Sequence, residues 1–300
     1  MRISDPVKNG QVFGLLLIAG VSGCTCHPPE EADEVFIPGG TFTMGHTPFA
    51  EHGGCRTFGQ PCNDFAPAHR VTLSPYFINK FEVTFGEYEA CAQAGMCEPD
   101  PTAGAFRAKL TDPAFAKLPM LGAPKDAAER YCQSKGRRLP TEAEWERAAR
   151  GTEGFDYPWG NQLPTCDRVP EQCEPKVSVG LYPERMRAVG STPGDVTREG
   201  VFDLYGNAAE VVADFYDKGY YAVSPENDPK GPERASWTDG DYATRGAGTQ
   251  VAYAEWDDSL RGFPVWARDE WGTRSGFRCA RDVRQAGVIS SSAGRWVAPV

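Results

Sequence analysis

Short apolar stretches separated by glycine and proline run through most of the chain. The segment FIPGGTFTMG (36–45) places apolar residues on both sides of a glycine pair, which predicts two short strands. HRVTLSPYFINKFEVT (69–84) alternates apolar and polar positions like a pair of strands, with Ser-Pro-Tyr as the turn or bulge. The body of the protein is therefore expected to begin as a small β structure.

Three later segments have the apolar spacing and the termini of short helices: 84–95, 125–136 and 136–151. Thr84 with Glu87, and Thr141 with Glu144, have the spacing of a capping box, in which each side chain bonds the other residue's backbone N–H. Gly136 is expected to end one helix just before the next begins. The rest of the body, about half of it, is rich in turns and has no long periodic segment.

The composition adds two limits to this picture. With 33 glycines and 25 prolines, 300 residues fit one large irregular domain as well as two smaller ones. The net charge of −10 and the absence of a basic run disfavour nucleic acid as a partner, because phosphate binding needs a basic face.

The first residues have the pattern of an export signal. Arg2 and Lys8 precede the apolar run VFGLLLIAGV (12–21), which is too short to span a bilayer and is followed by Val-Ser-Gly-Cys24. This predicts a bacterial lipoprotein signal over 1–23, lipidation of Cys24 and a tether over 24–34; an ordinary secretory signal is the alternative. Thr25 favours the outer membrane, with the chain facing the periplasm or the exterior.

An exported chain with this many cysteines is expected to contain disulfides. Three pairs lie close together in sequence, and elimination then pairs Cys132 with Cys279. A zinc site is the weaker alternative, because no second pair or histidine stands at ligand spacing. The predicted pairs are Cys55–Cys62, Cys91–Cys97, Cys166–Cys173 and Cys132–Cys279.

Seven segments follow one another along the chain: IPGGTFTMG, HRVTLSPYFINKFEVT, GRRLPTEAEWERAARG, YPWGN, GVFDLYGNAAEV, RGAG and GFRCAR. In this order they resemble the formylglycine-generating enzyme (sulfatase-modifying factor) family. The resemblance covers residues 35–284 and leaves 285–300 as a loose tail. It implies an α+β fold, a single irregular domain related to C-type lectins, and it supports the Cys132–Cys279 pairing.

Active members of this family are expected to oxidise a sulfatase cysteine with copper(I) held by two thiolates just after the RGG-type motif. Soft thiolates are the ligands that copper(I) prefers. Here the corresponding stretch is RGAGTQVAYAEW (245–256), which contains no sulfur. The resemblance therefore implies a member without bound copper and without this oxidase activity.

The resemblance also implies a structural calcium ion near GVFDLYGNAAE (200–210). Carboxylate and carbonyl oxygens are the ligands that Ca²⁺ prefers. The alternative is that the glutamate pairs with an arginine. The expected ligands are Asp203, the carbonyls of Gly206 and Ala208, and Glu210.

Aromatic and arginine side chains gather after residue 244, as they often do at recognition surfaces. They predict a groove that binds a protein, a peptide or a glycan. The alternative for Arg245 and Arg278 is that each is buried and forms an ion pair. The groove candidates are Arg245, Trp256, Arg261, Trp266, Arg268 and Trp271.

A second hypothesis is that the chain is a periplasmic oxidoreductase resembling siderophore-maturing relatives. In this case the reaction would use an acid among Glu255, Asp257, Asp258, Asp269 and Glu270.

Overall fold

The computed structural model describes residues 33–46, 56–57, 60–61, 65–99, 112–170, 173, 186–217, 219–234, 242–246 and 275–283. Cys24, Cys55, Cys62 and the predicted signal and tail lie outside these residues. The strands are β1 (Glu34–Ile37), β2 (Gly40–Met44), β3 (Arg56–Thr57), β4 (Gln60–Pro61), β5 (His69–Leu73), β6 (Tyr76–Asn79), β7 (Glu210–Phe215), β8 (Tyr242–Arg245) and β9 (Ala280–Asp282). The helices are α1 (Phe85–Gln93), α3 (Lys125–Ser134) and α4 (Glu142–Arg150), with short 3₁₀ turns η1 (Phe115–Lys117) and η4 (Tyr220–Ala222).

The β structure at the start of the body is one antiparallel ladder divided into two sheets. β1 pairs with β6 and β2 pairs with β5, and β9 adds to the free side of β6. The pairs Ile37–Tyr76 and Gly40–Leu73 belong to the same register. The two strands expected in 69–84 are present and are interrupted at Ser74 and Pro75. They pair with the preceding segment and not with each other.

The ladder bends where Pro38 and Gly39 face Ser74 and Pro75. Neither proline has a backbone N–H to donate, so the ladder cannot continue through this corner. A Cβ on Gly39 would lie 2.8 Å from the Leu73 carbonyl oxygen and 2.9 Å from the Pro75 nitrogen. The absence of a side chain at Gly39 thus permits the two sheets to meet.

The three predicted helices are present, and both predicted capping boxes are formed. Thr84 caps α1 together with Glu87, and Thr141 caps α4 together with Glu144. The last helix starts later than its sequence segment, at Glu142, because Pro140 lies in the extended link that follows Gly136.

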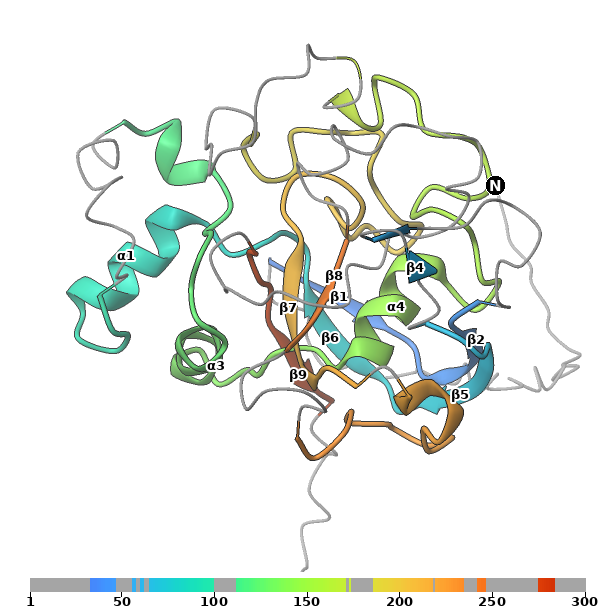
Figure 1. Ribbon diagram of the computed structural model, residues 1–300. Coiled ribbons are helices and arrows are strands. Elements are labelled where there is room, and N and C mark those ends of the chain that lie inside the picture. Colours follow the sequence, from blue (N-terminus) through green and yellow to red (C-terminus); the bar gives the residue numbers. More distant parts are fainter. Residues whose placement is uncertain are drawn as a thin grey trace, which may run out of the picture.

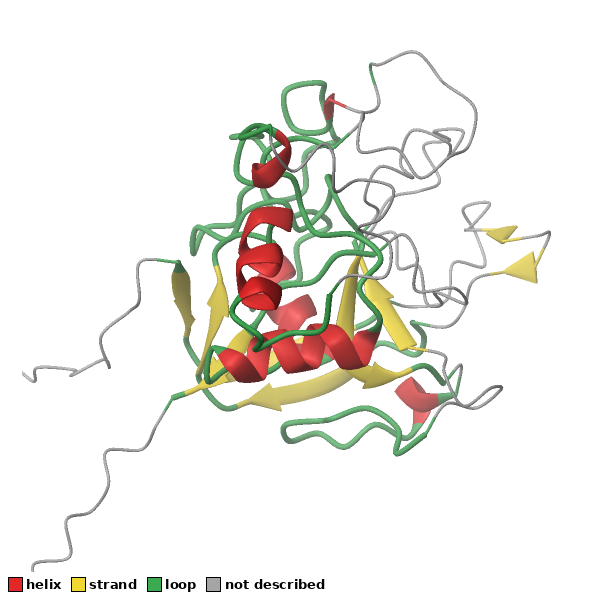
Figure 2. Ribbon diagram, turned by 90° about the vertical axis from the view of Figure 1, so that its left-hand side faces the viewer, coloured by secondary structure: helices red, strands yellow, loops and turns green. Residues whose placement is uncertain are grey.

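α4 lies at the centre of the described fold. It packs against β2, β5, β7 and β8, and its Trp145 and Ala148 are fully buried. β7 lies between α3 on one side and α4 on the other (Figure 1). A second apolar cluster joins α1 and α3 to Val211 of β7 and to Phe277. Loops connect these elements over much of the described chain (Figure 2).

This arrangement confirms the expected α+β class. Three of the predicted disulfides are present: Cys91–Cys97, Cys166–Cys173 and Cys132–Cys279. The last of these joins α3 to the segment just before β9, across 147 residues of sequence. Within the described ranges, no helix is long and apolar enough to cross a bilayer.

Candidate functional site

Arg245, the first residue of the RGAG segment, ends β8 with its side chain fully buried. Its Nη1 donates to Oε1 of Glu142 and to the hydroxyl of Tyr221, each at 3.1 Å, and its Nη2 donates to Glu146. Arg150 also donates to Glu146, at 2.6 Å. Two carboxylates of α4 thus share guanidinium groups inside the protein, shielded from water.

The buried carboxyl groups around α4 have different pKa shifts. Burial alone would raise the pKa of Glu146, but the guanidinium groups of Arg245 and Arg150 lower it to about 2. Burial raises the pKa of Glu142 in spite of Arg245. Burial and the charge of Glu142 raise the pKa of Asp214 well above its usual value. The carboxyl groups near Arg245 therefore differ in how readily each one ionises.

The burial of Arg245 corrects one part of the groove prediction. A side chain with no exposed surface and two carboxylate partners cannot line an open groove, so the alternative of a buried ion-pair partner holds for this residue. The other candidates lie outside the described residues: Trp256, Arg261, Trp266, Arg268 and Trp271.

Glu210 begins β7 and is also held by an arginine. Nε of Arg278 lies 2.9 and 2.8 Å from its two carboxylate oxygens, and Nη2 donates at 2.6 Å to one of them. The indole Nε1 of Trp145 donates to the second oxygen at 2.8 Å. A calcium ion at Glu210 would face this buried guanidinium, so the carboxylate does not fit a calcium ligand. The arginine pair, which was the alternative, is the arrangement found.

The other positions of the predicted calcium site, Asp203, Gly206 and Ala208, lie in the buried loop before β7. The backbone N–H of Gly206 donates to Asp195 at 2.7 Å, and that of Ala208 donates to Glu82 at 2.9 Å. Carboxylates therefore organise this loop through its backbone. Among the described residues, no group of three or more acidic, histidine or cysteine side chains is arranged to hold a metal. Calcium binding stays a prediction.

The cysteines of the described body are all paired. Cys279, which lies in the GFRCAR segment, is bonded to Cys132. It is also the only cysteine after Cys173 in the sequence. A pair of free thiolates downstream of Arg245 therefore cannot form from residues near it in sequence.

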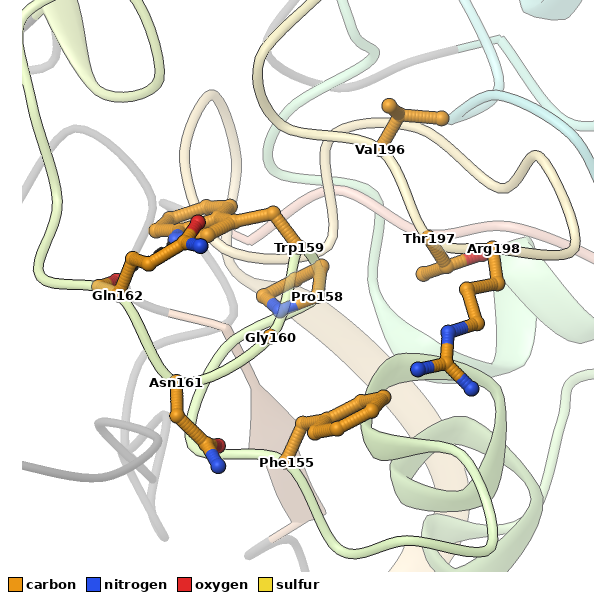
Figure 3. Close-up of a pocket in the computed structure, with 9 residues that line it drawn as sticks. All are labelled: Phe155, Pro158, Trp159, Gly160, Asn161, Gln162, Val196, Thr197 and Arg198. Atoms are coloured by element: carbon orange, nitrogen blue, oxygen red, sulfur yellow. Dashed lines mark hydrogen bonds between the residues drawn. The ribbon is translucent and has the colours of Figure 1, made fainter.

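A pocket of about 400 Å³ opens beside the YPWGN segment (Figure 3). The loop after α4 forms one side and the turn at 196–198 forms the other (Figure 3). The sequence alone does not predict this site, because YPWGN contributes only to the family resemblance and the turn lies more than thirty residues away. Two aromatic residues among turn residues were the available signal. The lining residues are Phe155, Pro158, Trp159, Gly160, Asn161, Gln162, Val196, Thr197 and Arg198.

The sequence pattern of the sulfatase-modifying factor enzyme 1-like domain matches residues 24–283. The chain is 29% identical to a formylglycine-generating enzyme from Streptomyces coelicolor, over 92% of this chain and 96% of that protein. A formylglycine-generating enzyme from Thermomonospora curvata is also 29% identical, over 83% of this chain and 93% of that protein.

Solved structures give the same assignment of the fold. PvdO from Pseudomonas aeruginosa superimposes with a TM-score of 0.54 and 25% identity, over 83% of this chain and 94% of that one. Treponema denticola variable protein 1 superimposes with a TM-score of 0.56 over the same shares of each chain, and at 18% identity it supports the fold alone.

Proposed function

Because this chain belongs to the sulfatase-modifying factor family, we propose that it is a member without formylglycine-generating oxidase activity, acting as a binding module of the bacterial cell envelope. Its partner in this proposal is a protein, a peptide or a glycan. Lipidation at Cys24 would hold it on the membrane, and the outer membrane is the proposed location.

One observation carries the proposal: the only cysteine after Cys173 is committed to a disulfide. Copper(I) oxidation of a cysteine substrate needs soft thiolate ligands close to the substrate's own sulfur. In the segment Gln250–Trp256 the side chains are amide, aliphatic, aromatic and carboxylate groups. None of these replaces a pair of thiolates for copper(I).

The test is an oxidase assay on the purified mature chain. The protein is supplied with copper(I) and air and mixed with a peptide that carries the sulfatase cysteine motif. Conversion of cysteine to formylglycine is followed by mass spectrometry. The Streptomyces coelicolor enzyme serves as the positive control. We expect no conversion by this chain; turnover comparable to the control would overturn the proposal.

A second candidate is a periplasmic oxidoreductase of altered chemistry. The likeness to PvdO over most of both chains favours it. In that case an acid among Glu255, Asp257, Asp258, Asp269 and Glu270 would take part in the reaction. These residues lie outside the described part of the chain. Substituting them together with amides would abolish such an activity and leave a binding function based elsewhere unchanged.

A further inference from the structure

The pocket beside YPWGN is built on a rigid aromatic base. The ring of Trp159 stacks on Tyr157 at 5.1 Å, with 1° between the ring planes, and meets Tyr205 edge-on at 5.4 Å. The backbones of Tyr157 and Gly160 bond each other at 3.0 Å in both directions. A site that is already ordered loses little conformational freedom when a ligand enters.

Two side-chain amides at the edge of the pocket have donors to offer. The carbonyl oxygen of Asn161 accepts from the backbone N–H of Asp156 at 2.9 Å, and that of Gln162 accepts from Arg168 at 3.0 Å. With its oxygen engaged, each amide presents an NH₂ group. Both residues are exposed, so these groups can reach a ligand.

The charge in the pocket is neutralised before any ligand arrives. Arg198 is the only charged residue among the described residues that line the pocket, and its Nη1 lies 2.5 Å from a carboxylate oxygen of Glu153. Its guanidinium also lies over the ring of Phe155, 4.6 Å from the centroid. The part of the lining that the structure describes contains no carboxylate that would attract a cation. The pocket therefore selects for a neutral ligand.

The remaining features identify the chemistry of that ligand. Phe155 and Trp159 are half-buried and supply aromatic ring surface to the pocket. Part of this surface is already covered, because Trp159 stacks on Tyr157 and lies under the Arg168 guanidinium, and Arg198 lies over Phe155. The ring surface that remains can pack against polarised C–H groups of a ligand. The amides supply hydrogen-bond donors for hydroxyl oxygens. A volume of about 400 Å³ lies in the range of small-molecule pockets. A pyranose ring combines C–H faces, hydroxyl groups and neutrality in one unit.

We propose that this pocket binds a neutral pyranose unit of a glycan. The proposal rests on the binding function proposed above and names its partner class. A peptide strand is less well matched, because the described lining is made of turns and offers no strand edge for backbone pairing.

The test is calorimetric titration of the mature full-length chain with two neutral probes, chitotetraose and cellotetraose, and with an anionic heparin tetrasaccharide. We expect saturable binding of at least one neutral probe and weaker binding of heparin. The double variant N161A/Q162A should reduce the affinity for the neutral probe at least tenfold. The matched control is Leu163→Ala, a neighbouring exposed residue outside the lining, which should leave the affinity unchanged.

Three results would overturn the pocket assignment: no binding of either neutral probe, tighter binding of heparin, or unchanged affinity in N161A/Q162A. None of them bears on the missing thiolates, which the oxidase assay tests separately. Conversely, conversion of the cysteine peptide would remove the proposed function even if the sugar bound. The two failures are therefore distinguishable.

Discussion

Two buried glutamates of α4 depend on a guanidinium group that comes from β8. Arg245 is separated from Glu142 and Glu146 by about a hundred residues in sequence, so local patterning gave no sign of this contact. The RGAG motif was compatible with Arg245 as a groove-lining side chain or as a buried ion-pair partner. Only the packing of β8 on α4 distinguishes these two roles. Single residues at such long-range contacts are the part of the site that the sequence predicts least well.

Replacing Arg245 with methionine should destabilise the protein strongly. Removing one partner leaves buried carboxylates without their cation, which costs about 3–5 kcal/mol. Urea denaturation measures the loss. The control is Arg70→Met, which breaks an exposed pair with Glu226 and should cost at most about 1 kcal/mol. Equal losses in the two variants would show that the buried arrangement around Arg245 is wrong.

Asp214→Asn should stabilise the protein at neutral pH. A carboxyl group with a raised folded-state pKa binds its proton more tightly when folded, so wild-type stability rises as the pH falls through that pKa. Asparagine does not titrate, and its carbonyl oxygen can still accept the N–H of Glu142.

The stability difference between Asp214→Asn and wild type should therefore be largest near pH 8 and shrink toward pH 4. Thermal and urea unfolding at a series of pH values give this profile. A difference that is constant with pH, or one that grows as the pH falls, would contradict the raised pKa of Asp214.

At the level of elements, local signals and long-range pairing were predictable to different degrees. Both capping boxes were evident in the sequence, because their bonds lie within three residues. The partners of β5 and β6 were not, because alternation marks a strand but does not name its neighbour. The close approach of Gly39 to Leu73 and Pro75, at the corner between the two sheets, is visible only in the tertiary structure.

Gly39→Ala should weaken this corner. The added Cβ would meet backbone atoms of Leu73 and Pro75 within 3 Å, and such overpacking costs about 1–3 kcal/mol. Gly219→Ala is a suitable control, because its nearest new contact is a side-chain oxygen at 3.4 Å. Denaturant unfolding gives the free energy of unfolding of both variants. A Gly39→Ala protein as stable as Gly219→Ala would argue against the close approach at the corner.

At the level of the whole molecule, the Cys132–Cys279 disulfide ties α3 to the segment just before β9. Its removal in C132S/C279S should lower the unfolding free energy by about 2–5 kcal/mol. The matched variant C166S/C173S opens a loop of only 7 residues against 147, so its loss should be smaller. Calorimetric unfolding compares the two; a larger loss in C166S/C173S would contradict this ranking.

The fold class was predictable because seven segments, in their order along the chain, resemble one family. The absence of cysteine from residues 245–256 was likewise evident from the sequence. The pocket was not, because its two sides come from loops whose positions no periodic pattern fixes. Trp159 was present in the sequence analysis only within the YPWGN segment, and the tertiary structure places it opposite the turn that carries Arg198 (Figure 3).

The central claim is that this chain has no thiolate pair for copper(I). Differential alkylation and mass spectrometry of the mature protein, without reductant, test it most directly. We predict that Cys91–Cys97, Cys166–Cys173 and Cys132–Cys279 are recovered as disulfides and that no two free cysteines take up copper(I) together. Two free body cysteines that jointly bind copper(I) would contradict the account.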